Sequence, residues 1–216
     1  DDGSVVTWGD SSYGGDSSLV ADDLASGVSH ISSTDNAFAA LKDDGSVVTW
    51  GNSSNGGDSS AVADDLASGV SQIISSNYAF AALKNNGSVI TWGSSIFGGD
   101  SSSVSEELAS GVRQVFSSMF TFAAVKDDGS VVTWGFPGNG GDSSSVSNEL
   151  SSGVAQIFSN TYAIAALKDD GSLITWGSSS WGGDSSAVAD DLASGVSQVS
   201  STERAFAALK DDGSVV

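Results

Sequence analysis

Asp-Asp-Gly-Ser-Val-Val-Thr-Trp-Gly, residues 43–51, is the stretch that decides how this chain is organised. Closely similar stretches begin at residues 1, 85, 127 and 169, so the period is 42 residues with no insertion or deletion. A fixed period of this length indicates a repeat architecture, in which neighbouring units bury one another's apolar faces. We therefore expect one repeat domain with units at 1–42, 43–84, 85–126, 127–168 and 169–210, followed by the start of a sixth at 211–216.

Tryptophan, lysine and glycine occupy fixed places in the repeat. Five of the six tryptophans share one position, namely Trp8, Trp50, Trp92, Trp134 and Trp176. The lysines share another, namely Lys42, Lys84, Lys126, Lys168 and Lys210. Glycine recurs at the positions of Gly3, Gly9, Gly14, Gly15 and Gly27. Each unit therefore needs the same special backbone geometry at the same points.

One unit contains three short β-type runs, which we expect at residues 28–32, 37–41 and 46–50. The third run, Ser-Val-Val-Thr-Trp, is rich in β-branched and aromatic residues. Asp44-Gly45 lies between the second and third runs, and Asp-Gly between such runs predicts a tight hairpin. Neither run carries a charge on either face, so we expect neighbouring repeats to cover both faces.

The segment from Asp10 to Ser26 fits two kinds of local structure. A turn at Gly14-Gly15-Asp16 comes first. Val20 and Leu24 then have helical i, i+4 spacing, and Gly27 is suited to end a helix. A short helical turn and an irregular or fourth-strand segment both remain open.

Small antiparallel sheets repeated near every 42 residues predict an all-β, β-propeller-like fold, with five blades if the ring is closed. An open β-solenoid or filament segment is the alternative. Residues 1–9 supply a third strand, and residues 194–210 supply two strands that need one. Pairing them would close a ring, but residues 211–216 can begin the same strand locally.

Charge and composition exclude several classes of function. The chain has 27 acidic residues against 7 Lys+Arg, a net charge of −20, so it would repel nucleic-acid phosphates. It has no cysteine, which excludes disulfides and thiolate metal sites. No apolar run approaches the length of a membrane span. His30 is the single histidine, and no catalytic set accompanies it, so we expect no enzyme.

The Asp-Gly-Ser-Val-Val-Thr-Trp-Gly core, followed by Tyr13-Gly14-Gly15, Leu24, Gly27-Val28 and Phe38-Ala39-Ala40-Leu41, resembles the regulator of chromosome condensation repeat. The resemblance covers all five units and implies a β-propeller that serves as an interaction scaffold. This repeat is shorter than the family's, and residues 33–37 replace the family's Gly-x-x-His-Thr stretch. Nucleotide exchange and chromatin binding are therefore not carried over.

Two positions vary strongly within an otherwise near-constant frame. One holds Tyr13, Asn55, Phe97, Asn139 and Trp181, and the other holds Asn36, Tyr78, Phe120, Tyr162 and Arg204. Asn at the first position accompanies Tyr at the second within a 42-residue unit, and the reverse holds for Tyr13 with Asn36, whereas Phe97 with Phe120 breaks the alternation. The pattern predicts two loops that share one rim and bind a ligand or partner. Drift in tolerant loops, or filling of gaps between units, is the alternative.

Repeated aspartates are the candidate metal ligands. They follow each Gly-Gly pair and are Asp16, Asp58, Asp100, Asp142 and Asp184. Carboxylate oxygens suit Ca²⁺, the one cofactor we consider, although no known calcium loop is matched. Hydrogen bonds to nearby backbone N–H groups are the simpler role.

Taken together, these patterns favour a non-catalytic structural or interaction module, part of a larger secreted or surface protein or fibre. A lectin-like ring that binds multivalent carbohydrate is the alternative. We expect a protein or glycan partner, self-association through the repeat ends, and an extracellular or cell-surface location.

Overall fold

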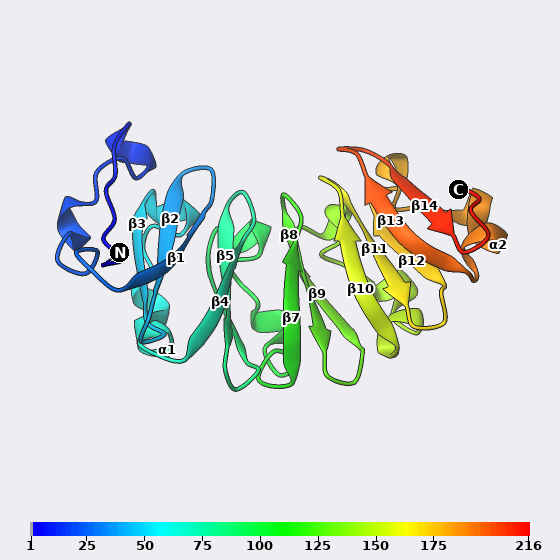
Figure 1. Ribbon diagram of the computed structural model, residues 1–216, viewed down its shortest axis with the longest axis horizontal. Coiled ribbons are helices and arrows are strands. Elements are labelled where there is room, and N and C mark those ends of the chain that lie inside the picture. The colour runs from blue at the N-terminus through cyan, green and yellow to red at the C-terminus, as the bar shows by residue number, and fades with distance from the viewer. Residues whose placement is uncertain (1) are drawn as a thin grey trace. The chain divides into compact units, whose positions relative to one another are not determined.

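The computed structural model describes residues 2–216 as two compact units, which meet in sequence at Ser110 and Gly111. Unit 1 (residues 2–110) contains two three-stranded sheets, and unit 2 (residues 111–216) contains two three-stranded sheets and one two-stranded sheet (Figure 1). All pairs are antiparallel, and strands that follow one another in sequence are neighbours in each sheet. The expected all-β fold of small repeated sheets is confirmed.

The sheets of unit 1 are β1 (Val28–Ser33), β2 (Ala37–Lys42) and β3 (Val47–Gly51), then β4 (Val70–Ser75), β5 (Ala79–Lys84) and β6 (Val89–Gly93). Those of unit 2 are β7 (Val112–Ser117), β8 (Thr121–Lys126) and β9 (Val131–Gly135), then β10 (Val154–Ser159), β11 (Ala163–Lys168) and β12 (Leu173–Gly177), then β13 (Val196–Ser201) and β14 (Phe206–Lys210). The expected strand bounds are thus met within one residue.

The hairpin between β2 and β3 shows why the turn sequence is so constant. The Gly45 N–H donates to the Lys42 carbonyl oxygen at 2.9 Å, and Gly45 has a φ of +79°, which glycine adopts without strain. The Asp44 carboxylate accepts hydrogen bonds from the Ser46 N–H at 2.9 Å and from its hydroxyl at 2.6 Å. The turn is therefore fixed by local chemistry in each repeat.

Neighbouring sheets bury one another, as expected. In unit 1, Ala39 and Leu41 of the first sheet form one core with Ile73 of the second. In unit 2, Val125 packs with Ile157, and Ala165 packs with Val199. The middle strands β5 and β8 are buried at five of their six residues, so both of their faces are covered.

The tryptophans contact the preceding repeat. Trp50 stacks on Phe38 with ring centroids 5.2 Å apart, and its Nε1–H donates to the Gly14 carbonyl oxygen at 3.0 Å. Trp92 does the same with Phe80 and Gly56, at 5.1 Å and 3.1 Å. Trp176 donates to Gly140 at 3.0 Å. These side chains are buried, as the repeat packing requires.

The loops between sheets contain short helical turns and no strand. Two copies form a four-residue α-helix, α1 (Ala63–Leu66) and α2 (Ala189–Leu192). Three-residue 3₁₀ turns occupy the remaining helical stretches: Ser11–Tyr13, Ser18–Val20, Ser53–Asn55, Ser60–Val62, Ser95–Phe97, Ser102–Val104, Pro137–Asn139, Ser144–Val146, Glu149–Ser151, Ser179–Trp181 and Ser186–Val188. The helical alternative is therefore correct, and the fourth-strand alternative for this segment is wrong.

The repeated lysines close these loops. The ammonium group of Lys168 donates to the Glu149 carbonyl oxygen at 2.7 Å, and that of Lys84 donates to Asp65 in the equivalent place. A cation near the last carbonyls of a helical turn is electrostatically favourable.

The two terminal segments behave differently. Residues 2–9 repeat the sequence of β3 but form no strand, because no middle strand of unit 1 lies beside them. Trp8 and Val6 are consequently 84% and 78% exposed.

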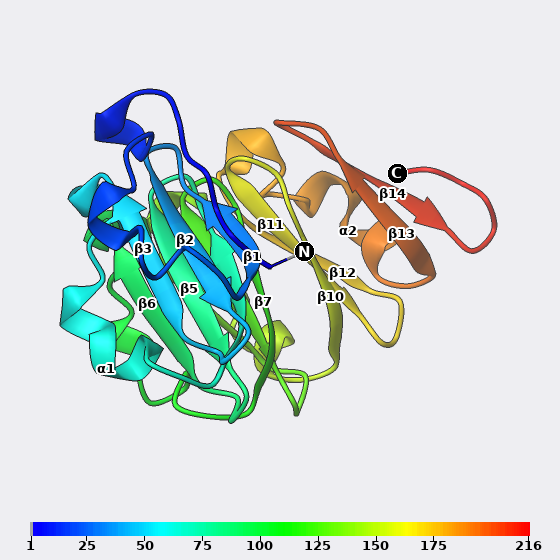
Figure 2. The same cartoon turned by 60° about the vertical axis from the view of Figure 1, so that its left-hand side comes forward.

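At the C-terminal end, Val216 and Ala208 exchange backbone hydrogen bonds of 2.9 and 2.8 Å, so the chain turns back beside β14 (Figure 2). Of the two segments expected to pair with the last two strands, residues 211–216 are therefore the one that lies beside β14.

None of the helices within residues 2–216 has the length and apolar character to cross a membrane.

Candidate functional site: the loop rim

Each three-stranded sheet has two loops at the same end, which we call its rim loops. One joins the first and second strands, and the other follows the third strand. A backbone hydrogen bond ties them together: the Asn52 N–H donates to the Asn36 carbonyl oxygen at 2.8 Å. The equivalent bonds join Ser94 to Tyr78, Phe136 to Phe120 and Ser178 to Tyr162 at 2.9–3.0 Å. The two variable positions therefore meet at one rim.

The side-chain pairs differ from the expected ones. Asn36 does not pair with Tyr13 of its own 42-residue unit; its amide Nδ2 donates to Asn55 Oδ1 at 3.2 Å. Likewise Tyr78 contacts Phe97, with ring centroids 4.8 Å apart. The expected pairing within one unit is wrong because each sheet crosses the boundary between two sequence periods. Tyr13, 54% exposed, lies in the loop before the first sheet.

Four aromatic rings of unit 2 lie in a continuous row, which we call the aromatic row: Phe120, Phe136, Tyr162 and Trp181. Phe120 lies 6.5 Å from Phe136 and 6.0 Å from Tyr162, and Tyr162 lies 4.7 Å from Trp181, measured between ring centroids. All four side chains retain partial exposure. The row thus runs over the rim loops of consecutive sheets and presents an apolar surface.

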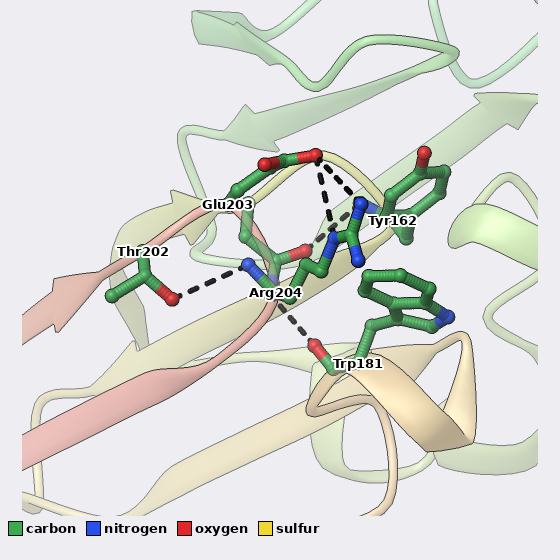
Figure 3. A network of polar contacts seen from close by, with 6 residues as sticks. Tyr162, Trp181, Thr202, Glu203 and Arg204 are labelled. Carbon is green, nitrogen blue, oxygen red and sulfur yellow. Dashed lines mark hydrogen bonds and ion pairs between the residues drawn. The ribbon is translucent and has the colours of Figure 1, made fainter.

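Arg204 ends the aromatic row. Its guanidinium carbon lies 4.2 Å from the centroid of the Trp181 ring, a cation–π contact (Figure 3). Its Nε and Nη2 atoms each lie 3.4 Å from Glu203 Oε1, while the Glu203 carbonyl oxygen accepts the Thr161 N–H at 3.3 Å. The ion pair is largely exposed, at 59% and 64%, so its stabilising effect is small. The guanidinium is therefore held over the ring yet open to a partner.

The rim of unit 1 is more polar. The Asp35 N–H donates to the Asn77 carbonyl oxygen at 2.9 Å, and the Asn77 amide contacts both Asp35 carboxylate oxygens at 3.1 Å. As in the Asn36–Asn55 pair, the polar side chains of this rim hydrogen-bond to each other. The two units therefore offer rims of different chemistry on the same backbone.

Asn139 enters the rim through its backbone, because its carbonyl oxygen accepts the Thr121 hydroxyl at 3.4 Å. Two rim residues, Phe136 and Glu203, do not belong to the two variable positions of the repeat and were not among the predicted binding residues. A signal for them exists in the sequence, since Phe136-Pro137-Gly138 and Glu203-Arg204 are the main breaks in the repeat. Both breaks lie at the rim.

The repeated aspartates after Gly-Gly have a structural role. Asp16 Oδ1 accepts the Ser18 N–H at 2.9 Å, and Asp58, Asp100, Asp142 and Asp184 accept the equivalent N–H at 2.9–3.0 Å. These backbone hydrogen bonds, with the serine side chains, hold the pKa of each carboxyl below its ordinary value. Across residues 2–216, no three His, Asp or Glu side chains gather as a metal centre requires. Calcium binding stays a prediction.

The residues of one sheet match a known family. The model described as Regulator of chromosome condensation (RCC1) repeat matches residues 28–56. Residues 28–56 are therefore similar to an RCC1 repeat. The matched residues run from the first strand through the rim loop after the third strand, so they cover one sheet with its rim. The resemblance expected from the sequence is confirmed, and a comparison with curated proteins gave no match.

Two solved structures have a similar fold. Prp20p from Saccharomyces cerevisiae is 16% identical, with a TM-score of 0.53 over 92% of this chain and 58% of that chain. The ectodomain of the receptor kinase CR4 from Physcomitrella patens is 15% identical, with a TM-score of 0.50 over 87% and 48%. This chain thus spans about half the length of these structures. The likeness shows the fold, and the expected β-propeller-like arrangement is confirmed.

Proposed function

We propose that this chain is a non-catalytic interaction module whose partner is a protein that contacts the aromatic row of unit 2. The row itself carries the proposal: Phe120, Phe136, Tyr162 and Trp181 are contiguous, partly exposed and ended by Arg204. Aromatic residues and arginine are the side chains that dominate binding energy at protein interfaces. The tilted rings and the guanidinium over Trp181 leave no flat open platform, which favours a protein over a sugar ring.

The charge of the chain indicates a basic partner. A net charge of −20 attracts positively charged proteins at long range and raises their association rate. It repels nucleic acids. Prp20p, which shares the fold, has binding properties toward Gsp1p and histones, and histones are basic. A basic protein surface is therefore the partner chemistry that we propose here.

Binding of core histones, used as a basic probe, tests the proposal by surface plasmon resonance. We expect Trp181→Ala to weaken binding at least about tenfold, since central aromatic residues are typical hot spots. Leu19→Ala is the control, because Leu19 is 100% exposed and lies outside both the rim and the terminal residues proposed for self-association. It should change binding less than about twofold. Equal losses in both variants, or none in Trp181→Ala, would contradict a site on the aromatic row.

A lectin-like function is the second candidate, and one observation favours it. A tyrosine paired with a second rim ring occurs in each of the two compact units: Tyr78 with Phe97 and Tyr162 with Trp181, with ring centroids 4.8 and 4.7 Å apart. Similar sites in several repeats would give avidity for multivalent glycans. A glycan array with and without Ca²⁺ tests this function, and an array with no binding under either condition rules it out.

We further propose an extracellular or surface location and self-association through the repeat ends. The acidic, cysteine-free composition supports the location. The exposed Val6 and Trp8 support the association, because their counterparts in β3 lie beside β2, and Trp50 also contacts Gly14 of the preceding repeat. Light scattering over a range of concentrations tests association, and a mass that stays monomeric at all concentrations contradicts it.

A further inference from the structure

Asn86 stands at the exposed tip of the β5–β6 hairpin, in the sequence Asn86-Gly87-Ser88. Its side-chain Oδ1 accepts two hydrogen bonds from Ser88, one from the N–H at 3.0 Å and one from the hydroxyl at 2.8 Å. Gly87 has a φ of +77° and keeps the turn tight. The side-chain oxygen is therefore fixed toward the turn. The amide nitrogen Nδ2 makes no hydrogen bond to any residue in the range 2–216.

We propose that Asn86 is the acceptor of an N-linked glycan. Asn-x-Ser with x other than proline is the pattern that the glycosylating transferase requires, on a surface loop. The hydroxyl of Ser88 already donates to the side-chain amide that would react. At this hairpin the Asn86 side chain is exposed, its Oδ1 accepts the Ser88 hydroxyl, and its Nδ2 is not hydrogen-bonded to another described residue. The site is independent of the partner that the aromatic row would bind.

The four equivalent hairpins show that the position tolerates a change. Asp44, Asp128, Asp170 and Asp212 stand where Asn86 stands, and each accepts the hydroxyl of the following serine at 2.6 Å. A carboxylate has no nitrogen to glycosylate. These hairpins therefore supply a natural Asn→Asp control: the same turn forms without an acceptor.

Asn52-Ser53-Ser54 is the second match to the pattern, and its surroundings differ. Asn52 is half-buried, and its N–H is bonded to the Asn36 carbonyl oxygen at 2.8 Å within the rim. Its Oδ1 accepts the Ser54 N–H at 3.0 Å at the start of a 3₁₀ turn. Within residues 2–216 the Ser54 hydroxyl makes no hydrogen bond to Asn52 such as the Ser88 hydroxyl makes to Asn86, and the half-buried Asn52 side chain leaves less room for a glycan. The structure accordingly assigns the modification to Asn86 and not to Asn52.

The reaction joins Asn86 Nδ2 to the anomeric carbon of an oligosaccharide carried on a lipid diphosphate. The C–N bond forms as the bond from the anomeric carbon to the diphosphate oxygen breaks. The lipid diphosphate leaves with the electron pair, and one proton of Nδ2 is lost to base. The hairpin tip lies at the end of β5 opposite its rim loop, since the rim loop precedes Ala79 and the tip follows Lys84. The glycan would therefore leave the rim of unit 1 uncovered.

The full chain, placed behind a cleavable secretion signal in eukaryotic cells, tests the proposal. Both the secreted and the cell-retained protein are analysed by intact mass and glycopeptide mapping, because transfer precedes export. We expect one N-glycan at Asn86 in most molecules. It should disappear in Asn86→Asp and in Ser88→Ala, and persist in Asn52→Asp. Circular dichroism of Asn86→Asp should match the parent, as four native hairpins carry aspartate there.

Two results would overturn the assignment. One is the absence of a glycan at Asn86 from both the secreted and the retained parent chain. The other is equal occupancy at Asn52, because the folded environments of the two asparagines would then have no influence. A loss of the glycan in Ser88→Ala with unchanged expression confirms that the serine hydroxyl, and not exposure alone, defines the acceptor.

Discussion

The indole Nε1–H of Trp50 donates a 3.0 Å hydrogen bond to the carbonyl oxygen of Gly14, which lies 36 residues earlier in the chain. Gly14 has a φ of +88°, and a Cβ there would lie 2.6 Å from Phe38, the ring on which Trp50 stacks. Three elements of the repeated sequence, the Gly-Gly pair, the phenylalanine and the tryptophan, therefore form one contact between neighbouring repeats. The contact explains why glycine and tryptophan recur at the positions of Gly14 and Trp50 in every copy, whereas the position of Phe38 holds isoleucine, Ile164, in one copy.

Replacing an internal tryptophan should destabilise the chain strongly. Trp92 is 4% exposed, so Trp92→Ala should lower the free energy of unfolding by about 3–5 kcal/mol. Trp8→Ala, at an 84% exposed copy of the same position, should change it by less than about 0.5 kcal/mol. Urea unfolding followed by far-UV circular dichroism measures both. Similar losses in the two variants would show that burial between repeats is not what the tryptophan contributes.

A methyl group on the second glycine of the Gly-Gly pair should also be costly. A Cβ on Gly183 would lie 2.6 Å from the carbonyl carbon and oxygen of Gly177, and backbone atoms cannot move aside easily. Gly183→Ala should therefore destabilise by about 1–3 kcal/mol. Gly138→Ala serves as control, since its nearest neighbour would be Phe136 Cε1 at 3.4 Å, an ordinary contact. Thermal unfolding of the two variants compares them, and a stable Gly183→Ala would refute the close approach.

The strands could be predicted because their causes are local. Gly45 with its positive φ, the Asp44–Ser46 hydrogen bonds and the uncharged run of β2 all lie within a few residues of one another. A repeat also shows the same local pattern several times. Hence the expected third strand, residues 46–50, differs from β3 by one residue at each end.

The rim partners could not be predicted in the same way. Asn36 and Asn55 are 19 residues apart, and their contact depends on the sheet that crosses the boundary between two periods. Reading the variable positions inside one period therefore gave the wrong pairs. Arg204 over Trp181 likewise depends on how two consecutive sheets pack, which neither loop sequence contains.

Removing a repeated lysine should open a loop. The Lys168 ammonium donates to the Glu149 carbonyl oxygen at 2.7 Å, and Lys168→Met keeps the length of the stem but not the donor. We expect a loss of about 1 kcal/mol, near the average net value of a hydrogen bond. Because the variant also raises the net negative charge, unfolding is measured at low and high NaCl. A loss that vanishes at high salt would assign the effect to charge repulsion instead of the loop contact.

Acid should weaken the hairpins that carry aspartate. The hydroxyl and N–H of the following serine hold the pKa of Asp44, Asp128, Asp170 and Asp212 below its ordinary value. A carboxyl with a lowered folded-state pKa stabilises the fold above the unfolded-state value near 3.9, and this contribution is lost as the pH falls through the folded-state pKa. Stability should therefore decline below about pH 4.

Replacing these four aspartates by asparagine tests the cause. Asn86 shows that asparagine accepts the same two serine hydrogen bonds, at 3.0 and 2.8 Å, without a titrating group. The fourfold variant should keep its turns and lose less stability than the parent between about pH 4 and pH 2. A charge-matched variant with asparagine at Asp43, Asp127, Asp169 and Asp211 separates the turn from net charge. If both variants have the same acid dependence in urea unfolding, the serine hydrogen bonds are not its source.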